Sequence, residues 1–349
     1  MPEITINKRK IGPGHPVYII AEMSANHNQD FDAAVELIHI AKDCGVDAIK
    51  IQTYTPDTIT LDCNNEYFQI GKGTIWEGKT LHSLYGEAYT PWEWQPKLKE
   101  IANDLGLDLF STPFDSTAVD FLEEMDVPVH KIASFELVDI PLIKKVAATG
   151  KPVIMSTGMG TLSEIDEAVS AFRQAGGKDL ILLKCTSSYP APPETMNLRT
   201  MQNMQETFGV PCGLSDHSMG IETPVAAVAL GACVIEKHFI KSRADGGPDS
   251  SFSLEAHELK AMVEAVRNTE KALGRVQYQV TEKEVAGRVF RKSIFVSHDI
   301  AAGETLCVDN IKCVRPGHGM HTRHYEEILG RIARKDIKAG TPMNWDLLV

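Results

Sequence analysis

Short apolar runs alternate with amphipathic stretches from Val17 to about Leu273. Each run begins with apolar or β-branched residues, as is typical of buried strands. The stretches between them have helical spacing, and DAAVELIHIAKDCG ends at Gly45, a residue type that commonly terminates helices. The predicted strands are VYIIAEMS (17–24), DAIKIQT (47–53), DLFSTPF (108–114), VHKIAS (129–134), PVIMSTG (152–158), LILLKCTS (180–187), CGLSDH (212–217) and VIEKHF (234–239).

This order of elements predicts a (β/α)₈ TIM barrel, because eight strands alternate with seven helical or mixed connections and a last helix follows at 255–273. The alternative is an open doubly wound sheet, which usually carries a glycine-rich phosphate turn after its first strand. The segment after the first predicted strand, AEMSANHNQD, is not such a turn. We therefore expect a barrel domain over residues 1–280.

The connection between the second and third strands is unusually long, from Tyr54 to about Leu107. Loops of this length in compact domains usually act as lids or binding loops. Its many aromatic side chains either pack the segment onto the barrel or cover a substrate, and both interpretations stay open.

Beyond Leu273 the pattern changes, and from about Thr281 helical spacing gives way to short β runs. A weak repeat is visible, because SHDIAAGETLCVDNI (297–311) and RKDIKAGTPMNWDLL (334–348) share D-I-x-A-G-x. Each copy is typical of a strand end followed by a turn that needs glycine. We predict a small β-rich module over residues 281–349.

The composition favours an intracellular enzyme over a nucleic-acid or membrane protein. A net charge of −12 makes nucleic acid and anionic membranes poor partners for the surface as a whole. No apolar run approaches the roughly 20 residues that span a bilayer, and the N-terminus lacks the features of a signal peptide. The 7 cysteines contain no CxxC pair, so we expect reduced thiols and a cytoplasmic location.

Polar residues gather at the ends of all the predicted strands. In a β/α barrel these ends meet at one mouth, where active sites lie. A barrel wall built only for stability would end in Val, Ile or Ala, so we predict that the mouth is an active site. The residues are Glu22, Lys50, Thr112, Lys131, Ser134, Ser156, Thr157, Lys184, Ser187, Ser215, Asp216, His217, Glu236 and His238.

Two histidines, His217 and His238, end the last two predicted strands, which are neighbours in a barrel. Each has a carboxylate nearby, Asp216 or Glu236. A single histidine is commonly a hydrogen-bonded core residue, whereas two on adjacent strand ends indicate metal ligands. Neutral imidazoles are good ligands for Mn, Fe, Co or Zn, so we expect a divalent metal ion. Two protein ligands leave positions for water and substrate, as in a catalytic site.

Lys50 and Lys131 lie on strands that should be buried, and a buried ammonium group needs a carboxylate or an anionic ligand. One interpretation pairs them with Glu22 or Glu136. The other adds the hydroxyl groups of neighbouring strand ends and predicts a cradle for a phosphate and a carboxylate. Glu22 is also a candidate general base, and Asp249 lies on a glycine-rich loop over the same mouth.

At this point the motifs resemble a known family. IIAEMSANHNQDFDAA, DAIKIQTYTP, LFSTPFD, HKIASFE, VIMSTGM, KCTSSYPAPPETMNL, GLSDHSMG, VIEKHF and GGPDSSFS, in this order, are similar to the sialic acid synthases. RKSIFVSHDIAAGE and VRPGHG resemble their antifreeze-like SAF domain. The resemblance covers essentially the whole chain. It is strongest to the pseudaminic acid synthase branch, through QTYTPDTITLD, GTIWEGKTLHSLYGEAYTPWEW and TSSYP.

The resemblance implies a transferase that condenses phosphoenolpyruvate with an N-acylated amino sugar, giving a nine-carbon sialic acid and phosphate. In the pseudaminic branch the sugar is 2,4-diacetamido-2,4,6-trideoxy-L-altrose. N-acetylneuraminate and legionaminate synthases are the alternatives. The N-acetylneuraminate branch usually carries Asn where this chain has Ser187, which argues against N-acetylmannosamine as the substrate.

The resemblance also implies roles for individual residues and a homodimer with swapped domains. His217 and His238 hold the metal, with Mn²⁺ first and Mg²⁺ or Co²⁺ as alternatives. Glu22, Glu236 and Asp249 are the candidate catalytic residues, and Arg315 reaches the site of a second subunit. Phosphoenolpyruvate and sugar are bound by Lys50, Thr112, Lys131, Ser134, Glu136, Ser156, Ser187, Tyr189 and Ser215.

Two rival functions remain from the residues alone. One is a Schiff-base aldolase, in which Lys131 or Lys184 is the nucleophile. The other is a non-catalytic binder whose β module recognises ice or a glycan. The module is charged rather than flat and Thr-rich, and the mouth retains its polar residues, so both features argue against a binder.

Overall fold

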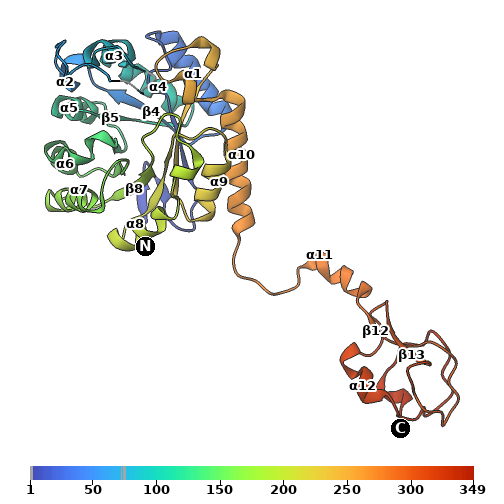
Figure 1. Ribbon diagram of the computed structural model, residues 1–349. Coiled ribbons are helices and arrows are strands. Elements are labelled where there is room, and N and C mark those ends of the chain that lie inside the picture. The colour runs from blue at the N-terminus through green and yellow to red at the C-terminus, as the bar shows by residue number, and fades with distance from the viewer. Residues whose placement is uncertain (1–2, 72, 74–75) are drawn as a thin grey trace. The chain divides into compact units, whose positions relative to one another are not determined.

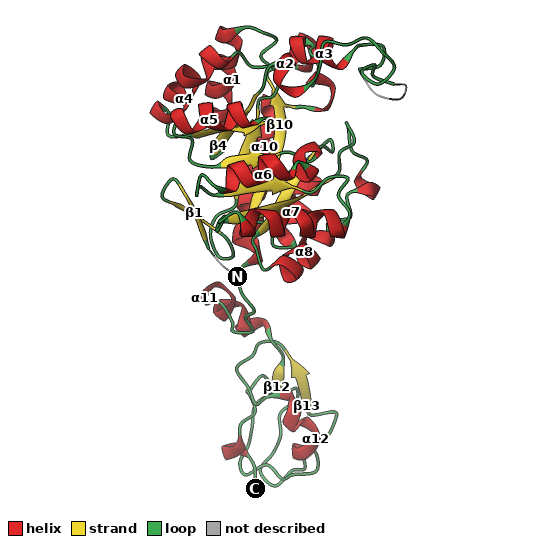
Figure 2. Cartoon of the chain, turned by 90° about the vertical axis from the view of Figure 1, so that its left-hand side faces the viewer, coloured by secondary structure: helices red, strands yellow, loops and turns green. Residues whose placement is uncertain are grey.

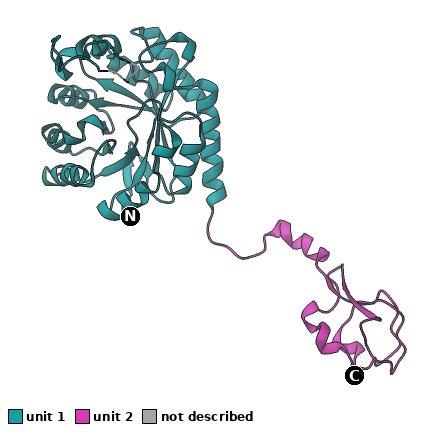
Figure 3. Cartoon of the chain, viewed as in Figure 1, with its two compact units in different colours: residues 1–274 teal, residues 275–349 magenta. Residues whose placement is uncertain are grey.

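The computed structural model describes residues 3–71, 73 and 76–349. Three positions of the long second connection, Lys72, Thr74 and Ile75, therefore lie outside the described residues. The chain divides into two compact units, Met1–Gly274 and Arg275–Val349 (Figure 3). This division comes a few residues before the boundary predicted at 280.

The first unit is built on a closed parallel barrel, as predicted. Each strand pairs with the next along the chain, and the last one, β10, pairs with both β9 and β3, which closes the ring. The alternative of an open sheet is wrong. The strands are β3 (Tyr18–Glu22), β4 (Ala48–Thr53), β5 (Asp108–Pro113), β6 (His130–Ile132), β7 (Val153–Ser156), β8 (Leu180–Cys185), β9 (Cys212–Asp216) and β10 (Val234–Ile240), and a two-residue strand, β11 (Leu254–Glu255), adds to β10.

Helices surround the ring of strands (Figures 1 and 2). The first of them ends at Gly45 in a left-handed conformation with φ 82°, as its sequence predicts. Within the described ranges, no helix has the length and apolar character needed to cross a membrane. The helices of this unit are α1 (Phe31–Cys44), α2 (Pro56–Ile59), α3 (Leu81–Ala88), α4 (Gln95–Asp104), α5 (Ser116–Glu124), α6 (Ile140–Ala147), α7 (Leu162–Gln174), α8 (Thr200–Phe208), α9 (Glu222–Ala229) and α10 (Ala256–Leu273).

The N-terminal half of the barrel interior is apolar and is sealed by a hairpin that we did not predict. Strands β1 (Ile4–Ile6) and β2 (Arg9–Ile11) pair antiparallel across a turn in which Asn7 and Lys8 have φ of 42° and 68°. Two positive φ angles are typical of the tight turns that join hairpin strands. The side chains of Ile4, Ile6 and Ile11 pack with the interior residues Tyr18, Ile20, Ala48, Phe110, Ile154, Ile181, Leu183 and Val234.

The long second connection contains α2, α3 and α4 and is anchored to the barrel by several polar contacts. His27 Nε2 lies 3.0 Å from Thr90 Oγ1. Thr53 Oγ1, on β4, donates to Gln95 Oε1 at 2.7 Å. Within the connection, Trp92 Nε1 donates to the Tyr54 carbonyl at 3.1 Å. Trp94 of the connection also packs edge-on against His27 and Phe31 of the barrel domain. Trp76 has a different position and belongs to the candidate site.

The second unit contains β12 (Ser293–Val296), β13 (Ile311–Val314) and two short helices, α11 (Glu282–Val285) and α12 (Tyr325–Ile328). Our expectation that helices end near Thr281 was wrong for these two helices.

The two copies of the sequence repeat in this unit bind each other reciprocally. Ile300 and Ile337 exchange backbone hydrogen bonds of 2.8 Å in both directions. The Asp299 side chain accepts from the Ala339 amide at 2.9 Å, and the Asp336 side chain accepts from the Ala302 amide at 2.8 Å. The repeat therefore corresponds to two equivalent turns that each complete the other.

Candidate active site

Charged side chains meet inside the C-terminal half of the barrel. Lys131 on β6 and Glu236 on β10 lie on strands that are not neighbours in the ring, yet Lys131 Nζ is 4.0 Å from Glu236 Oε1. The two side chains can approach only through the interior. The predicted strand-end residues that are buried here are Glu22, Lys50, Thr112, Lys131, Ser134, Ser156, Ser215, His217 and Glu236.

Two lysines and two glutamates form one continuous network. Lys50 Nζ lies 3.1 Å from Glu22 Oε2 and 3.5 Å from Glu236 Oε2. Lys50 also donates to Thr112 Oγ1 at 3.4 Å. Because none of the four charged groups lies in bulk water, each depends on the others or on a ligand for compensation.

The pKa values of the charged groups in this network are shifted in different directions. Burial raises the pKa of Glu22, and Lys50 only partly offsets this effect. Burial also opposes ionisation of Glu236, but Lys131 and Lys50 hold its pKa below the ordinary value. Burial lowers the pKa of Lys131 to about 8. Glu22 is thus the more basic carboxylate and Lys131 the more readily deprotonated lysine.

Hydroxyl groups and one glycine form a small cradle beside Lys131. Lys131 Nζ donates to Ser156 Oγ at 2.6 Å. The Gly158 amide donates to Ser134 Oγ at 3.1 Å. A Cβ atom on Gly158 would lie 2.2 Å from Ser187 Oγ and 2.6 Å from Ser134 Oγ, so only glycine fits here without displacement. Ser215 takes another role, because its hydroxyl donates to Glu236 Oε1 at 2.9 Å.

The rings of His217 and His238 lie side by side, with centroids 5.3 Å apart. His217 Nδ1 donates a hydrogen bond to the Thr186 carbonyl oxygen, 3.1 Å away, so in the neutral ring Nε2 keeps its lone pair. Burial lowers the pKa of His238 well below its ordinary value, so this imidazole is neutral. Its Nδ1 is buried and has no hydrogen-bond partner in the described part of the chain. Two lone-pair nitrogens at adjacent strand ends fit a divalent cation.

Aromatic side chains border this imidazole pair. The Tyr189 ring lies 4.4 Å from His217 and 5.0 Å from Phe252, and Phe252 lies 5.1 Å from His238. Trp76, from the long second connection, is 5.9 Å from Tyr189. Its Nε1 donates to the Pro248 carbonyl at 3.1 Å. The long connection therefore reaches the loop that carries Asp249.

Two further carboxylates have raised pKa values. Burial raises the pKa of Asp249, against hydrogen bonds from Ser24 and the Ala25 backbone. Burial raises the pKa of Glu136 to about 7. One Glu136 oxygen is buried without a hydrogen-bond partner among the described residues. Both carboxylates can accept further hydrogen bonds from a ligand.

Some predicted residues lie elsewhere. The Asp216 carboxylate is bound to Lys237, 2.6 Å away, so its charge is already compensated beside His217. Lys184 Nζ donates to the Cys185 carbonyl at 2.6 Å, outside the charge network. Arg315 follows β13 in the second unit, where it is exposed.

Two residues of the mouth were missed by sequence reasoning. Gln52 donates to Glu22 Oε1 at 2.9 Å. The Cys185 sulfur lies 3.7 Å from both Ser187 Oγ and His217 Nδ1. Side-chain alternation along the strands could have identified both, because residues two positions apart point to the same face. Gln52 follows Lys50 by two positions, and Cys185 follows the interior residue Leu183 by two.

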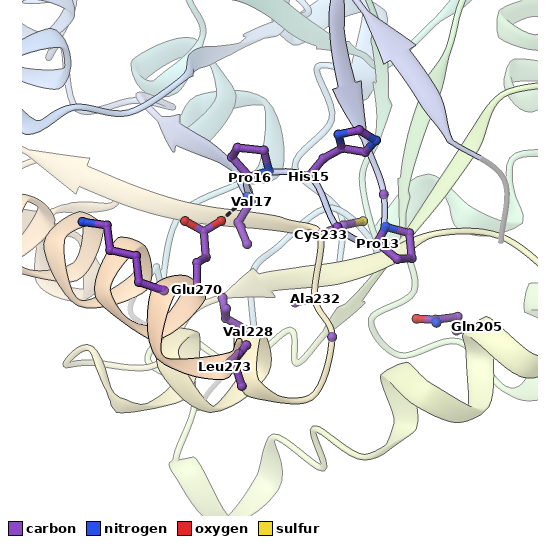
Figure 4. Close-up of a pocket in the computed structure, with 14 residues that line it drawn as sticks. Pro13, His15, Pro16, Val17, Gln205, Val228, Ala232, Cys233, Glu270 and Leu273 are labelled. Atoms are coloured by element: carbon purple, nitrogen blue, oxygen red, sulfur yellow. Dashed lines mark hydrogen bonds between the residues drawn. The ribbon is translucent and has the colours of Figure 1, made fainter. Parts of the chain in front are cut away.

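A cavity of about 470 Å³ lies at the opposite end of the barrel, beside the start of β3 and the end of α10. Figure 4 shows its lining, in which Glu270 accepts a hydrogen bond from the Val17 amide. In β/α barrels, residues on this face usually contribute to stability rather than to catalysis. Its described lining contains none of the predicted site residues.

Comparison with known proteins places this site in a family. Residues 37–278 match the model of the NeuB family, and residues 291–349 match the SAF domain. The chain belongs to the NeuB family. In this NeuB-family chain the SAF domain falls within the second compact unit.

Relatives of this NeuB-family chain match it over nearly its full length. It is 46% identical to the pseudaminic acid synthase of Helicobacter pylori, over 95% of this chain and 97% of that protein. It is 47% identical to the pseudaminic acid synthase of Campylobacter jejuni serotype O:2, over 93% and 94%. The crystal structure of N-acetylneuraminic acid synthetase from Leptospira borgpetersenii, in complex with citrate, has a TM-score of 0.72 and 35% identity and covers 82% of this chain and 95% of that chain.

Proposed function

We propose that this chain is a pseudaminic acid synthase. It condenses phosphoenolpyruvate with 2,4-diacetamido-2,4,6-trideoxy-L-altrose to give pseudaminic acid and phosphate. The observation that carries the reaction type is the buried network of Lys50, Lys131, Glu22 and Glu236 next to two imidazoles, in a NeuB-family barrel. The names of the relatives at 46–47% identity support the choice of sugar.

Phosphoenolpyruvate binds at the lysines and the hydroxyl cradle. Its carboxylate and phosphate groups supply the negative charge that two buried ammonium groups require. Ser134, Ser156 and Ser187 lie close enough together around Gly158 to donate to phosphate oxygens. Thr112 and Ser215 hold Lys50 and Glu236 in place by the hydrogen bonds described above.

His217 and His238 hold a divalent cation, with Mn²⁺ first and Mg²⁺ or Co²⁺ as alternatives. The buried, unpartnered Nδ1 of the neutral His238 ring supports this assignment. A cation held by these two imidazoles would supply Lewis-acid polarisation of the sugar aldehyde.

The residues of the mouth then guide bond formation. The C3 carbon of phosphoenolpyruvate attacks the aldehyde carbon of the open-chain sugar, and positive charge develops at C2. Glu236 stabilises that charge, since Lys131 and Lys50 keep it ionised. Water adds at C2, and the tetrahedral intermediate expels phosphate by cleavage of the C–O bond. The lysines hold the reactants in line throughout.

Glu22 is the general base that takes the proton from this water. Its raised pKa makes it the stronger base of the two glutamates. Glu22→Gln should retain phosphoenolpyruvate binding, measured by calorimetry, while turnover falls by orders of magnitude. Near-normal turnover in this variant would exclude the role.

Sugar binding involves Tyr189, which packs against His217, and the carboxylates of Glu136 and Asp249, all from segments beyond the strand ends. A phosphate-release assay with phosphoenolpyruvate and the precursors of pseudaminic, legionaminic and N-acetylneuraminic acid, with and without chelator, tests both substrate and cation. With ¹⁸O in the bridging position of phosphoenolpyruvate, C–O cleavage leaves the label in the released phosphate. Preferential turnover of either alternative sugar would refute the proposed substrate.

Schiff-base chemistry at Lys131 is the second candidate, because burial lowers the pKa of this amine to about 8. Borohydride would then trap a carbonyl substrate on the protein and inactivate it. Lys131→Arg keeps the positive charge but cannot form the imine. Full retention of turnover in this variant, with no borohydride adduct in the wild type, would remove the candidate.

The functional form is a cytoplasmic homodimer in which Arg315 completes the site of a second copy. Subunits carrying Arg315→Ala and subunits carrying His217→Ala test this arrangement. Each homodimer should be inactive. Mixed dimers regain one intact site, so random reassortment should restore roughly a quarter of wild-type activity. No recovery on mixing would argue that each subunit supplies its own arginine.

A further inference from the structure

Asp216 and Lys237 form an ion pair that is almost fully buried, each residue with 1% relative exposure. Lys237 Nζ lies 2.6 Å from Asp216 Oδ2. The two residues are direct cross-strand partners on β9 and β10. Since side chains alternate along a strand, the pair occupies the opposite face from Ser215 and Glu236, which meet inside the barrel.

Each member of this pair directly precedes one of the imidazoles. Asp216 is followed by His217, and Lys237 is followed by His238. The pair also holds the residue on the other side of His217, because Asp216 Oδ1 accepts from the Ser218 amide at 2.9 Å and from its hydroxyl at 2.7 Å. Lys237 donates to the Ser218 carbonyl. The backbone on both sides of His217 is thus tied to the backbone of the neighbouring strand, one residue before His238.

Stability alone does not account for an ion pair at this position. Removing two charges from water is costly, and a well-packed apolar pair in a buried site is often as stable or more stable. The other outward-facing side chains of the wall, such as Ile235 and Phe239, are apolar and fully buried. What the ion pair adds is a directional link between β9 and β10, at the level where the two imidazoles project.

We propose that Asp216 and Lys237 are positioning residues for the cation site, and that their ion pair fixes the separation and orientation of the His217 and His238 rings. This inference rests on the proposed function, in which those rings hold a divalent cation. The pair itself touches neither the cation nor a substrate and acts only through the two strands.

The test is Mn²⁺ affinity, measured on the purified full-length dimer by electron paramagnetic resonance of free Mn²⁺. Two variants are needed. Lys237→Met leaves Asp216 buried and unpaired. The double variant Asp216→Asn with Lys237→Met removes both charges, and the amide retains an oxygen that accepts from Ser218. We expect both to weaken Mn²⁺ binding by about 10–100-fold, as losses of outer-shell support to metal ligands do.

Phosphoenolpyruvate affinity and the thermal unfolding midpoint separate positioning from general damage. The affinity for phosphoenolpyruvate should stay within about twofold of wild type, because Lys50 and Lys131 lie on other strands. The double variant should unfold at a higher temperature than Lys237→Met, since it leaves no unpaired charge. A double variant with wild-type Mn²⁺ affinity would overturn the proposal, since the two imidazoles would then be held correctly without the ion pair.

A control is His130→Gln, which changes a part-buried polar contact on the outside of the barrel wall. His130 Nε2 lies 2.8 Å from Glu123 Oε1, on β6 and α5. This variant should lose stability but keep its Mn²⁺ affinity. His217→Ala and His238→Ala test the cation site itself. If both bind Mn²⁺ like the wild type, the proposed function fails, whereas weak binding in these two with normal binding in the ion-pair variants refutes only the positioning role.

Discussion

Lys131 donates a 2.6 Å hydrogen bond to Ser156 from a neighbouring strand, and both side chains are almost fully buried. Burial of the amine lowers its pKa to about 8, so Lys131 loses its proton as the pH rises through that value. Phosphoenolpyruvate needs the ammonium form. Its dissociation constant should therefore rise above this pH, by up to about tenfold per pH unit.

Calorimetric titration of phosphoenolpyruvate between pH 6.5 and about 9.5 checks this prediction. The control is Lys131→Arg, whose guanidinium stays charged and should give a flat profile, although with weaker binding. A flat profile in the wild-type enzyme would contradict the assignment of Lys131 to phosphoenolpyruvate.

Trp76 joins the long second connection to the loop of Asp249 through its hydrogen bond to Pro248. Trp76→Phe keeps an aromatic ring but removes the donor. We expect the KM for the sugar to rise by about 3–10-fold, the equivalent of one hydrogen bond, while phosphoenolpyruvate affinity is unchanged. Steady-state kinetics with each substrate varied checks this. Tyr67→Phe is the control, because Tyr67 is 80% exposed on the same connection; an equal effect there would remove the specific role of Trp76.

Gly158 leaves room for the hydroxyls of Ser134 and Ser187. Gly158→Ala places a methyl group less than 3 Å from both, and phosphoenolpyruvate binding should weaken by about 1–3 kcal/mol. Calorimetry measures the change. Gly287→Ala, where a Cβ meets nothing within 4 Å, should leave the affinity unchanged. Wild-type affinity in Gly158→Ala would show that the cradle does not hold the phosphate.

Ile6 in the N-terminal hairpin is completely buried against the barrel interior. Ile6→Ala should lower the free energy of unfolding by about 2–5 kcal/mol, because it opens a cavity in the apolar layer. Urea unfolding of the full chain measures this, and kcat should be retained since the hairpin lies at the end of the barrel opposite to the charge network. Thr5→Ala, exposed on the same strand, should change stability by less than about 0.5 kcal/mol. Equal effects of the two variants would contradict the sealing role of the hairpin.

The barrel was predictable because its strands are short apolar runs that differ clearly from the amphipathic helices between them. The hairpin was missed although Ile4 and Ile6 alternate with a polar residue, since three-residue strands give little periodic signal. What they pack against is decided by residues far along the chain, such as Phe110 and Ile154.

The candidate site could be predicted as a list of residues but not as a set of contacts. Strand ends indicated the mouth, yet side-chain alternation decides which strand residues enter it. Lys184 and Asp216 were therefore placed in the mouth, while their neighbours Cys185 and His217 have contacts there. The pairing of Lys237 with Asp216 depends on strand register, which the sequence of one strand does not contain.

The apolar layer beneath Lys50 and Lys131 has a consequence for the order in which substrates bind and products leave. Tyr18, Phe110 and Ile154 pack together there and fill the barrel interior, so a ligand reaches the lysines from the loop side of the mouth. A molecule held by the lysines sits deeper than one held by Tyr189 and Asp249 on the loops. If the two substrates bind as proposed, phosphoenolpyruvate enters ahead of the sugar, and phosphate leaves after the nine-carbon product.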